Sequence, residues 1–236
     1  MSDLTELFSW TCPRCDGKTK GFEVIELIGD VRHCLQAYVG VAKDLNAMVI
    51  AFGGTQEHSI QNWVEDLYWK QLDINYPGMP GAVVHHGFYF AYHNTTIRVG
   101  ILDVVVRAKD LYGDINIMVT GHSMGGAMAS FCGLDLVVNH EAQNVQVLTF
   151  GQPRIGNAVF ASYYSDMCQI QYFPQKTYHH FPREVWLNNI GFGSLVYQVE
   201  KVCDGSGEDS SCSRLVTGNS ISDHLVYYGV GLMAET

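Results

Sequence analysis

Hydrophobic and polar positions along the chain fall into short strand-like runs and longer helix-like stripes. Residues 46–52, 115–119 and 145–150 form continuous apolar runs, typical of strands buried on both faces, and 22–28 and 34–41 are further strand candidates. Residues 96–112 and 126–138 carry apolar side chains at helical spacing. Because strands that alternate with helices form parallel crossover units, the pattern predicts an α/β fold with a mostly parallel central sheet and crossover helices.

A serine lies at the junction between the strand at 115–119 and the helix at 126–138. The sequence there is Gly121-His122-Ser123-Met124-Gly125, with a glycine two positions away on either side of the serine. In serine hydrolases this pattern forms a sharp turn that exposes the nucleophile, and small neighbours let strand and helix approach. We predict that Ser123 is a nucleophile and that the Met124 N–H faces the oxyanion of an intermediate. The alternative is a glycine-rich turn with an incidental serine.

The segment after the strand at 46–52 is a second candidate for chemistry. Two glycines and Thr55 follow the carboxyl end of this strand, where ligands bind in such sheets. We predict that Thr55 is the second oxyanion donor, a role compatible with the alternative of a helix cap. The helix that follows carries an apolar stripe, which indicates either core or a lid over an apolar cleft, and we favour the lid. The stripe consists of Ile60, Trp63, Val64 and Leu67.

The catalytic base is expected to be a histidine downstream of Ser123, because hydrolases of this topology place nucleophile, acid and base in that chain order. The candidates are His140, His179, His180 and His224. His140 ends a predicted helix and is typical of a C-terminal cap, whereas the adjacent pair is compatible with surface or core. We favour His224, because it lies where a loop enters the last amphipathic segment near the chain end.

Composition and charge narrow the classes of partner. The 236 residues suit a single α/β domain over 1–236, and 47% hydrophobic residues are ordinary for a globular protein. A net charge of −10 disfavours nucleic acid and anionic membrane surfaces as partners, although neutral lipid is met through apolar surface. No apolar run is long enough to cross a bilayer, so we expect no transmembrane segment. We expect neither a metal nor a cofactor.

Seven cysteines are many for a cytosolic enzyme and favour an oxidising compartment. Two pairs of cysteines are expected to form disulfides. Cys203–Cys212 would close a polar loop, and Cys12–Cys15 lies in a CxxC sequence, for which the alternatives are a redox pair or half of a zinc site. Cys132 is expected to be a buried apolar side chain. Asn94-Thr95-Thr96 is a glycosylation sequon. The chain nevertheless begins without the basic and apolar stretches of a signal peptide.

Four segments together resemble the fungal lipase-like family, the class 3 lipases, in the form found in plants. They are GGTQEHSIQNWVEDL, GHSMGGAMA, FGQPRIGN and SDHLVYYG, in the same order as in the family. The resemblance implies an α/β-hydrolase fold that hydrolyses carboxylic esters, typically acylglycerols, at a lipid–water interface. It implies Ser123 as nucleophile, His224 as base, and Thr55 with Met124 at the oxyanion hole. It also implies a protein that is secreted or resides in the endomembrane lumen.

The chain departs from the family pattern in three places. Gly53 replaces the arginine that the family has before its Gly-Thr pair, and the amino terminus is shorter than in family members. The family's strand and motif that hold the triad aspartate have no counterpart after FGQPRIGN and its helix. We therefore expect one strand of the sheet to be missing, or improvised from residues 168–173. Asp166 is the nearest acid in chain order but ends a helix, and Asp223 adjoins His224, so the sequence assigns no triad acid.

These features are compatible with three functions. The first is an ester hydrolase of the lipase type, and the second is a catalytically impaired protein of the same fold that binds lipid or regulates a partner lipase. The third is an acyltransferase or amidase with the same nucleophile. The serine and the histidine favour the first function, whereas the missing acid favours the second, because loss of the acid costs about 10⁴ in turnover in a serine protease.

Overall fold

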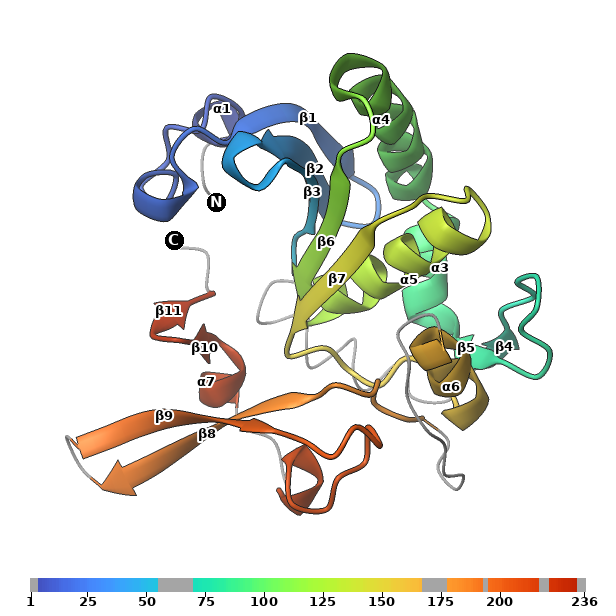
Figure 1. The fold of residues 1–236 in the computed structure, drawn as a ribbon, viewed down its shortest axis with the longest axis vertical. Helices are drawn as coiled ribbons and strands as arrows, with labels where there is room; N and C mark the ends of the chain where they lie inside the picture. The colour runs from blue at the N-terminus through green and yellow to red at the C-terminus, as the bar shows by residue number, and fades with distance from the viewer. Residues whose placement is uncertain (1–3, 55–69, 167–177, 193–194, 217–220, 233–236) are drawn as a thin grey trace. The chain divides into compact units, whose positions relative to one another are not determined.

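The structure, a computed structural model, describes residues 4–54, 70–166, 178–192, 195–216 and 221–232. The chain divides into two compact units, the first formed by Met1–Lys70, His85–Pro153 and Ala234–Thr236, and the second by Gln71–Val84 and Arg154–Met233. Among the described residues, the helices and strands of the first unit are α1 (Leu4–Phe8), β1 (Glu23–Asp30), β2 (Leu35–Ala42), β3 (Ala47–Phe52), α3 (His86–His93), α4 (Thr96–Tyr112), β6 (Asn116–His122), α5 (Met124–Val138) and β7 (Val145–Phe150), with 3₁₀ turns at Gly17–Thr19 and Lys43–Leu45 (Figure 1).

The first unit is built on a five-stranded sheet with the strand order β1-β2-β3-β6-β7. β2 pairs antiparallel with both of its neighbours, whereas β3, β6 and β7 pair in parallel, so four of the five strands run in one direction. The predicted strands and the mostly parallel sheet are thus confirmed. β6 continues past its predicted end at residue 119 to His122, because Gly121 still pairs with Phe52 of β3 and His122 with Phe150 of β7.

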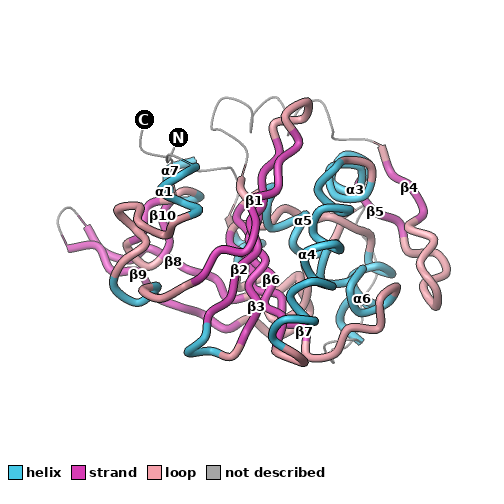
Figure 2. Tube along the Cα trace, turned by 90° about the horizontal axis from the view of Figure 1, so that it is seen from above, coloured by secondary structure: helices cyan, strands magenta, loops and turns pink. Residues whose placement is uncertain are grey.

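Helices α3, α4 and α5 lie together on one face of this sheet (Figure 2). The predicted apolar stripe of α4 is buried, and it consists of Ile97, Ile101, Val104, Val105 and Ala108. α5 is buried along almost its whole length, and Cys132 within it is fully buried, as predicted. Since both faces of α5 are covered, its position relative to the carboxyl ends of β6 and β7 is fixed by packing on all sides.

Asp30 at the end of β1 ties the sheet to the start of α4. Its carboxylate accepts hydrogen bonds from the backbone N–H of His33 at 2.9 Å and of Thr96 at 3.2 Å, and it lies 2.8 Å from His33 Nδ1. Burial alone raises the pKa of Asp30, but the hydrogen bonds from Thr96 and His33 outweigh it and lower the pKa from 3.8 to about 2. The ionised carboxylate therefore stabilises this corner of the fold.

The second unit contains the two-stranded sheet of β4 (Gln71–Asp73) and β5 (Val83–His85), α6 (Ala158–Asp166), the hairpin of β8 (Val185–Phe192) and β9 (Leu195–Val202), a 3₁₀ turn at Ser213–Leu215, α7 (Ile221–His224), and the short pair β10 (Val226–Tyr227) and β11 (Val230–Gly231). In the described part of the chain, β8 and β9 pair only with each other, and the five-stranded sheet ends at β7. Residues 168–173, expected to improvise a missing strand, lie outside the described residues.

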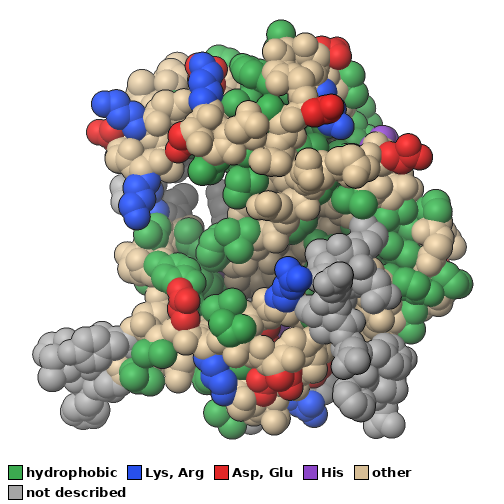
Figure 3. Space-filling view, viewed as in Figure 1, with side chains coloured by type: hydrophobic (Ala, Val, Ile, Leu, Met, Phe, Trp, Pro, Cys, Tyr) green, Lys and Arg blue, Asp and Glu red, His purple; other side chains and the backbone are tan. Residues whose placement is uncertain are grey.

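The disulfides of the structure agree with the sequence analysis. Both expected disulfides are formed, Cys12–Cys15 and Cys203–Cys212. None of the helices among the described residues combines the length and the apolar character that a membrane span needs. Acidic and basic side chains are interspersed on the face drawn in Figure 3 rather than gathered by sign.

Candidate active site

Ser123 lies on the turn between β6 and α5 in a strained backbone conformation. Its φ is 55° and its ψ is −123°, in a region that costs a residue with a side chain about 1–3 kcal/mol. The Ser123 N–H donates to Phe150 O at 2.9 Å, and the Ser123 carbonyl accepts from the N–H groups of Gly126 and Ala127 at 3.0 and 3.2 Å. These bonds hold the turn, and because they close its first helical turn, α5 begins at Met124 rather than at residue 126.

The glycines around Ser123 are required by close backbone approach, as the sequence predicted. A Cβ atom on Gly121 would lie 2.2 Å from Gly125 O, and one on Gly125 would lie 2.7 Å from Phe52 O and 2.8 Å from Gly53 O. Ordinary Cβ contacts begin at 3.4 Å. β6, the start of α5 and the end of β3 therefore meet at a distance that no side chain permits.

Residues that follow β7 brace the same turn from the other side. Ser130 Oγ, fully buried on α5, donates to Gln152 Oε1 at 2.7 Å and lies 3.1 Å from Gly126 O. The side chain of Gln152 also packs against Gly126, where an added Cβ would come within 3.3 Å of it. The loop after Phe150 is thus tied to the first two turns of α5, and the position of the nucleophile depends on both.

A buried ionic cluster anchors the far end of α5. Asp135 is fully buried and accepts hydrogen bonds from Arg98 Nε at 2.7 Å, Arg98 Nη2 at 3.0 Å, Tyr92 Oη at 3.1 Å and Asn139 Nδ2 at 2.8 Å. Burial alone raises the pKa of Asp135, but the hydrogen bonds from Arg98 and Asn139 outweigh it and hold the pKa below its usual range. The cluster joins α3, α4 and α5 and keeps α5 from sliding along the sheet.

The expected oxyanion donors and lid residues are only partly within the described residues. Met124 is the first residue of α5, so its backbone N–H comes directly after the nucleophile in the chain. Its side chain is buried. Thr55 lies outside the described residues, as do the four expected lid residues, Ile60, Trp63, Val64 and Leu67. Gly54, the last described residue of this segment, lies close to the turn, since an added Cβ would be 3.2 Å from His122 O.

The expected base and the candidate acids belong to the second unit. His224 is the last residue of α7 and is half-buried. The carboxylate of its neighbour Asp223 accepts a hydrogen bond from Asn189 Nδ2 of β8 at 3.2 Å. The backbone of Asp166 ends α6, as predicted, and its side chain lies outside the described residues. The pairing of Ser123 with His224, and the identity of the acid, stay predictions.

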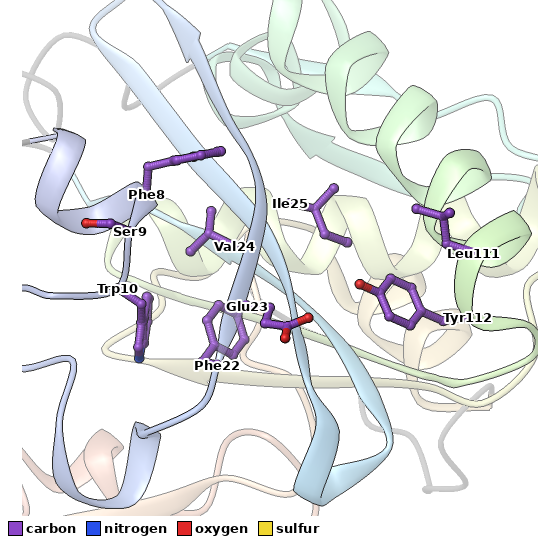
Figure 4. A pocket seen from close by; sticks show the side chains of 9 residues that line it. All are labelled: Phe8, Ser9, Trp10, Phe22, Glu23, Val24, Ile25, Leu111 and Tyr112. Atoms are coloured by element: carbon purple, nitrogen blue, oxygen red, sulfur yellow. The ribbon is translucent and has the colours of Figure 1, made fainter.

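An open groove of about 440 Å³ lies in the first unit between α1, β1 and the end of α4, lined mainly by aromatic and aliphatic side chains (Figure 4). Glu23, at the start of β1 in this groove, pairs with Val41, and the row continues through Met48 to Ile117 near the start of β6. Ser123 follows the opposite end of β6. The groove therefore lies at the amino-terminal ends of the parallel strands, whereas the nucleophile lies at their carboxyl-terminal ends.

Sequence reasoning missed three polar residues that support the site, Ser130, Gln152 and Asp135. Ser130 and Asp135 stand inside a helix that is otherwise apolar, and this could have identified them, because buried polar groups need partners. Their partners could not have been found in this way. Gln152 is 22 residues from Ser130 and Arg98 is 37 residues from Asp135.

Comparison with known proteins shows that the sequence is similar to lipases. Residues 49–180 match the family described as Lipase (class 3). The lipase of Rhizomucor miehei is 28% identical over 239 residues, which cover 94% of this chain and 62% of that protein. Secreted mono- and diacylglycerol lipase 1 of Fusarium solani is 27% identical over 207 residues, which cover 81% of this chain and 59% of that protein. This chain thus spans about three fifths of the length of these curated relatives.

A solved structure supports the same relationship. A triacylglycerol lipase whose catalytic centre is described as a serine protease triad matches with a TM-score of 0.72 at 28% identity, over 94% of this chain and 86% of that one. The match in tertiary structure extends over the sheet and helices described above, so the fold is the α/β-hydrolase fold. Since the family match covers more than half of the sequence, the chain belongs to the class 3 lipase family.

Proposed function

We propose that this protein hydrolyses carboxylic ester bonds in acylglycerols, with Ser123 as nucleophile and His224 as general base. The observation that carries the proposal is the strained backbone of Ser123 on a strand-to-helix turn, which presents a serine side chain at the carboxyl end of the sheet. The R. miehei and F. solani relatives are named as lipases, and the second as one for mono- and diacylglycerols. These names favour glycerol esters as the substrate class.

The proposed reaction proceeds through an acyl-enzyme. Ser123 Oγ attacks the ester carbonyl carbon while His224 takes its proton, and the negative charge on the carbonyl oxygen is stabilised by the N–H groups of Met124 and Thr55. The C–O bond to the alcohol then breaks, and the leaving alcohol takes the proton from His224. Water, deprotonated by His224, then attacks the acyl carbon. The bond from that carbon to Ser123 Oγ breaks, Oγ regains the proton from His224, and the fatty acid leaves.

We further propose that the stripe Ile60, Trp63, Val64 and Leu67 is a lid. An apolar stripe that covers a cleft in water would turn outward at a lipid surface, where it is no longer costly to expose. The rate should therefore rise when a short-chain ester passes its solubility limit, and Trp63→Ala should weaken that rise. A smooth saturation curve through this limit, unchanged in the variant, would remove the lid from the proposal.

The deciding experiment measures covalent labelling by a fluorophosphonate together with hydrolysis of p-nitrophenyl butyrate. The parent chain should be labelled at Ser123, and Ser123→Ala should abolish both labelling and hydrolysis. His224→Ala should reduce hydrolysis about as much as Ser123→Ala does, and the double variant should be no slower than either, because the two groups act as a unit. Parental hydrolysis in Ser123→Ala would contradict the proposal.

The second candidate function is an impaired lipase-like protein that binds lipid or regulates a partner lipase. The absence of the family's triad-acid motif from the sequence favours it. Without the acid, the surviving rate should be about 10³–10⁴-fold over water, the level that binding and the oxyanion hole supply alone. A parent chain that binds acylglycerol emulsions but resists fluorophosphonate would support this candidate over the first.

A further inference from the structure

We propose that Asn94 is a site of N-linked glycosylation. It begins the sequence Asn94-Thr95-Thr96, in which the middle residue is not proline and the third carries a hydroxyl, as the acceptor pattern requires. The chain contains no other Asn-x-Ser/Thr sequence. A single glycan at a single position is therefore expected.

The asparagine lies where the fold leaves room for a bulky polar group. Asn94 is the C-terminal cap of α3, two residues before α4 begins, and it is exposed. Its backbone N–H donates to Phe90 O at 2.9 Å. In the described part of the chain its side-chain amide makes no hydrogen bond, so a sugar on Nδ2 displaces no contact there. Surface corners of this kind are where N-glycans are carried.

The two threonines fix when the transfer must occur. Thr95 Oγ1 donates to Ala91 O at 2.8 Å and accepts from the Ile97 N–H, which caps the start of α4. Thr96 Oγ1 donates to Gly29 O at 3.1 Å at the end of β1. In the folded chain the hydroxyl of the acceptor sequence is thus held between α4 and the sheet. Transfer should therefore take place on the nascent chain, before α4 packs on β1.

The cysteines point to the compartment in which such transfer occurs. The chain forms two disulfides, Cys12–Cys15 in the first unit and Cys203–Cys212 in the second. Disulfides persist in secreted and luminal proteins and are rare in reducing cytosol. The disulfides are independent of the asparagine, and they favour folding in the secretory lumen, where the transfer would occur.

The transfer itself needs a polyprenyl-pyrophosphate-linked oligosaccharide as donor. A bond forms between Asn94 Nδ2 and the anomeric carbon of the first sugar, while the bond from that carbon to the pyrophosphate oxygen breaks. The polyprenyl pyrophosphate leaves with the bonding electrons and takes up the proton that the amide loses. No oxidant or reductant is involved.

The test is expression of the full chain into the secretory lumen of a eukaryotic host, followed by peptide N-glycosidase treatment. We expect one mobility step in the parent chain, and conversion of Asn94 to aspartate in the corresponding peptide by mass spectrometry. Asn94→Gln and Thr96→Ala should lack the step. The matched variants Thr95→Ala and Thr96→Ser, which alter the same corner but keep the acceptor sequence, should retain it.

Alkylation of free thiols in the same samples identifies chains that have reached the lumen, because Cys12, Cys15, Cys203 and Cys212 then resist the reagent. An oxidised parent chain without the mobility step would overturn the proposal. So would a step that persists in Asn94→Gln. The mobility step is read on denatured chains from whole lysate, so the result does not depend on whether a variant is secreted or on whether the chain hydrolyses esters.

Discussion

Gly125 stands where the first turn of α5 meets the end of β3, and one added methyl group there tests how tightly the nucleophile turn is held. In Gly125→Ala the new Cβ would lie 2.7 Å from Phe52 O and 2.8 Å from Gly53 O. Both distances are 0.6–0.7 Å short of the 3.4 Å at which ordinary Cβ contacts begin. Since both obstacles are backbone carbonyls, the start of α5 and the end of β3 must move apart.

The magnitude follows from two opposing terms. Overpacking of this kind costs about 1–3 kcal/mol, and backbone obstacles favour the upper end of that range. Alanine gains about 1 kcal/mol over glycine in a helix, which leaves a net loss of about 2 kcal/mol in the free energy of unfolding. The displacement matters more for catalysis, because sites tolerate about 0.5 Å and a misplacement of about 1 Å costs about 10² in rate. We expect kcat to fall about 10- to 100-fold.

The assay compares p-nitrophenyl butyrate hydrolysis and urea unfolding of the parent, Gly125→Ala and a control. Gly29→Ala is a suitable control, because its added Cβ has 3.9 Å to its nearest neighbour, Leu35 O. The control should keep parental kcat and lie within about 0.5 kcal/mol of parental stability. Kinetics are measured at a temperature where the circular dichroism of Gly125→Ala is native. A folded Gly125→Ala with parental kcat would refute the reasoning.

Three further changes probe the supports around the site. Arg98→Ala removes the guanidinium that pairs with buried Asp135 and leaves the carboxylate with the hydrogen bonds from Tyr92 and Asn139. Urea unfolding should therefore show a loss of about 3 kcal/mol, and a loss below about 1 kcal/mol would contradict the cluster's role. In the parent, the stabilisation from ionised Asp30 is complete above its unfolded pKa near 3.8 and is lost as the pH falls toward about 2. Asp30→Asn should lack this decline, and parallel profiles of unfolding free energy against pH in parent and variant would contradict the role of Asp30. Ser130→Ala removes the bond to Gln152 and should lower kcat about fivefold at unchanged KM, with recovery in Ser130→Thr; a change confined to KM would count against a positioning role.

Much of the fold could be predicted from local pattern alone. The continuous apolar runs at 46–52, 115–119 and 145–150 became β3, β6 and β7, and the helical stripe at 96–112 became α4 with the predicted residues buried. The serine turn could also be predicted, because strand and helix approach so closely there that only glycine fits two positions before and after Ser123. Burial and turn chemistry leave such marks because both depend on residues that are near one another in the chain.

The tertiary structure decided which distant residues pair with these local elements. β6 extends to His122 because β3 and β7 pair with it on both sides, and the conformation of Ser123 depends on a hydrogen bond to Phe150 in another strand. The bond between Ser130 and Gln152 likewise joins residues far apart in sequence. Sheet register and packing in three dimensions select such partners, and the periodicity of apolar residues along the chain does not predict them.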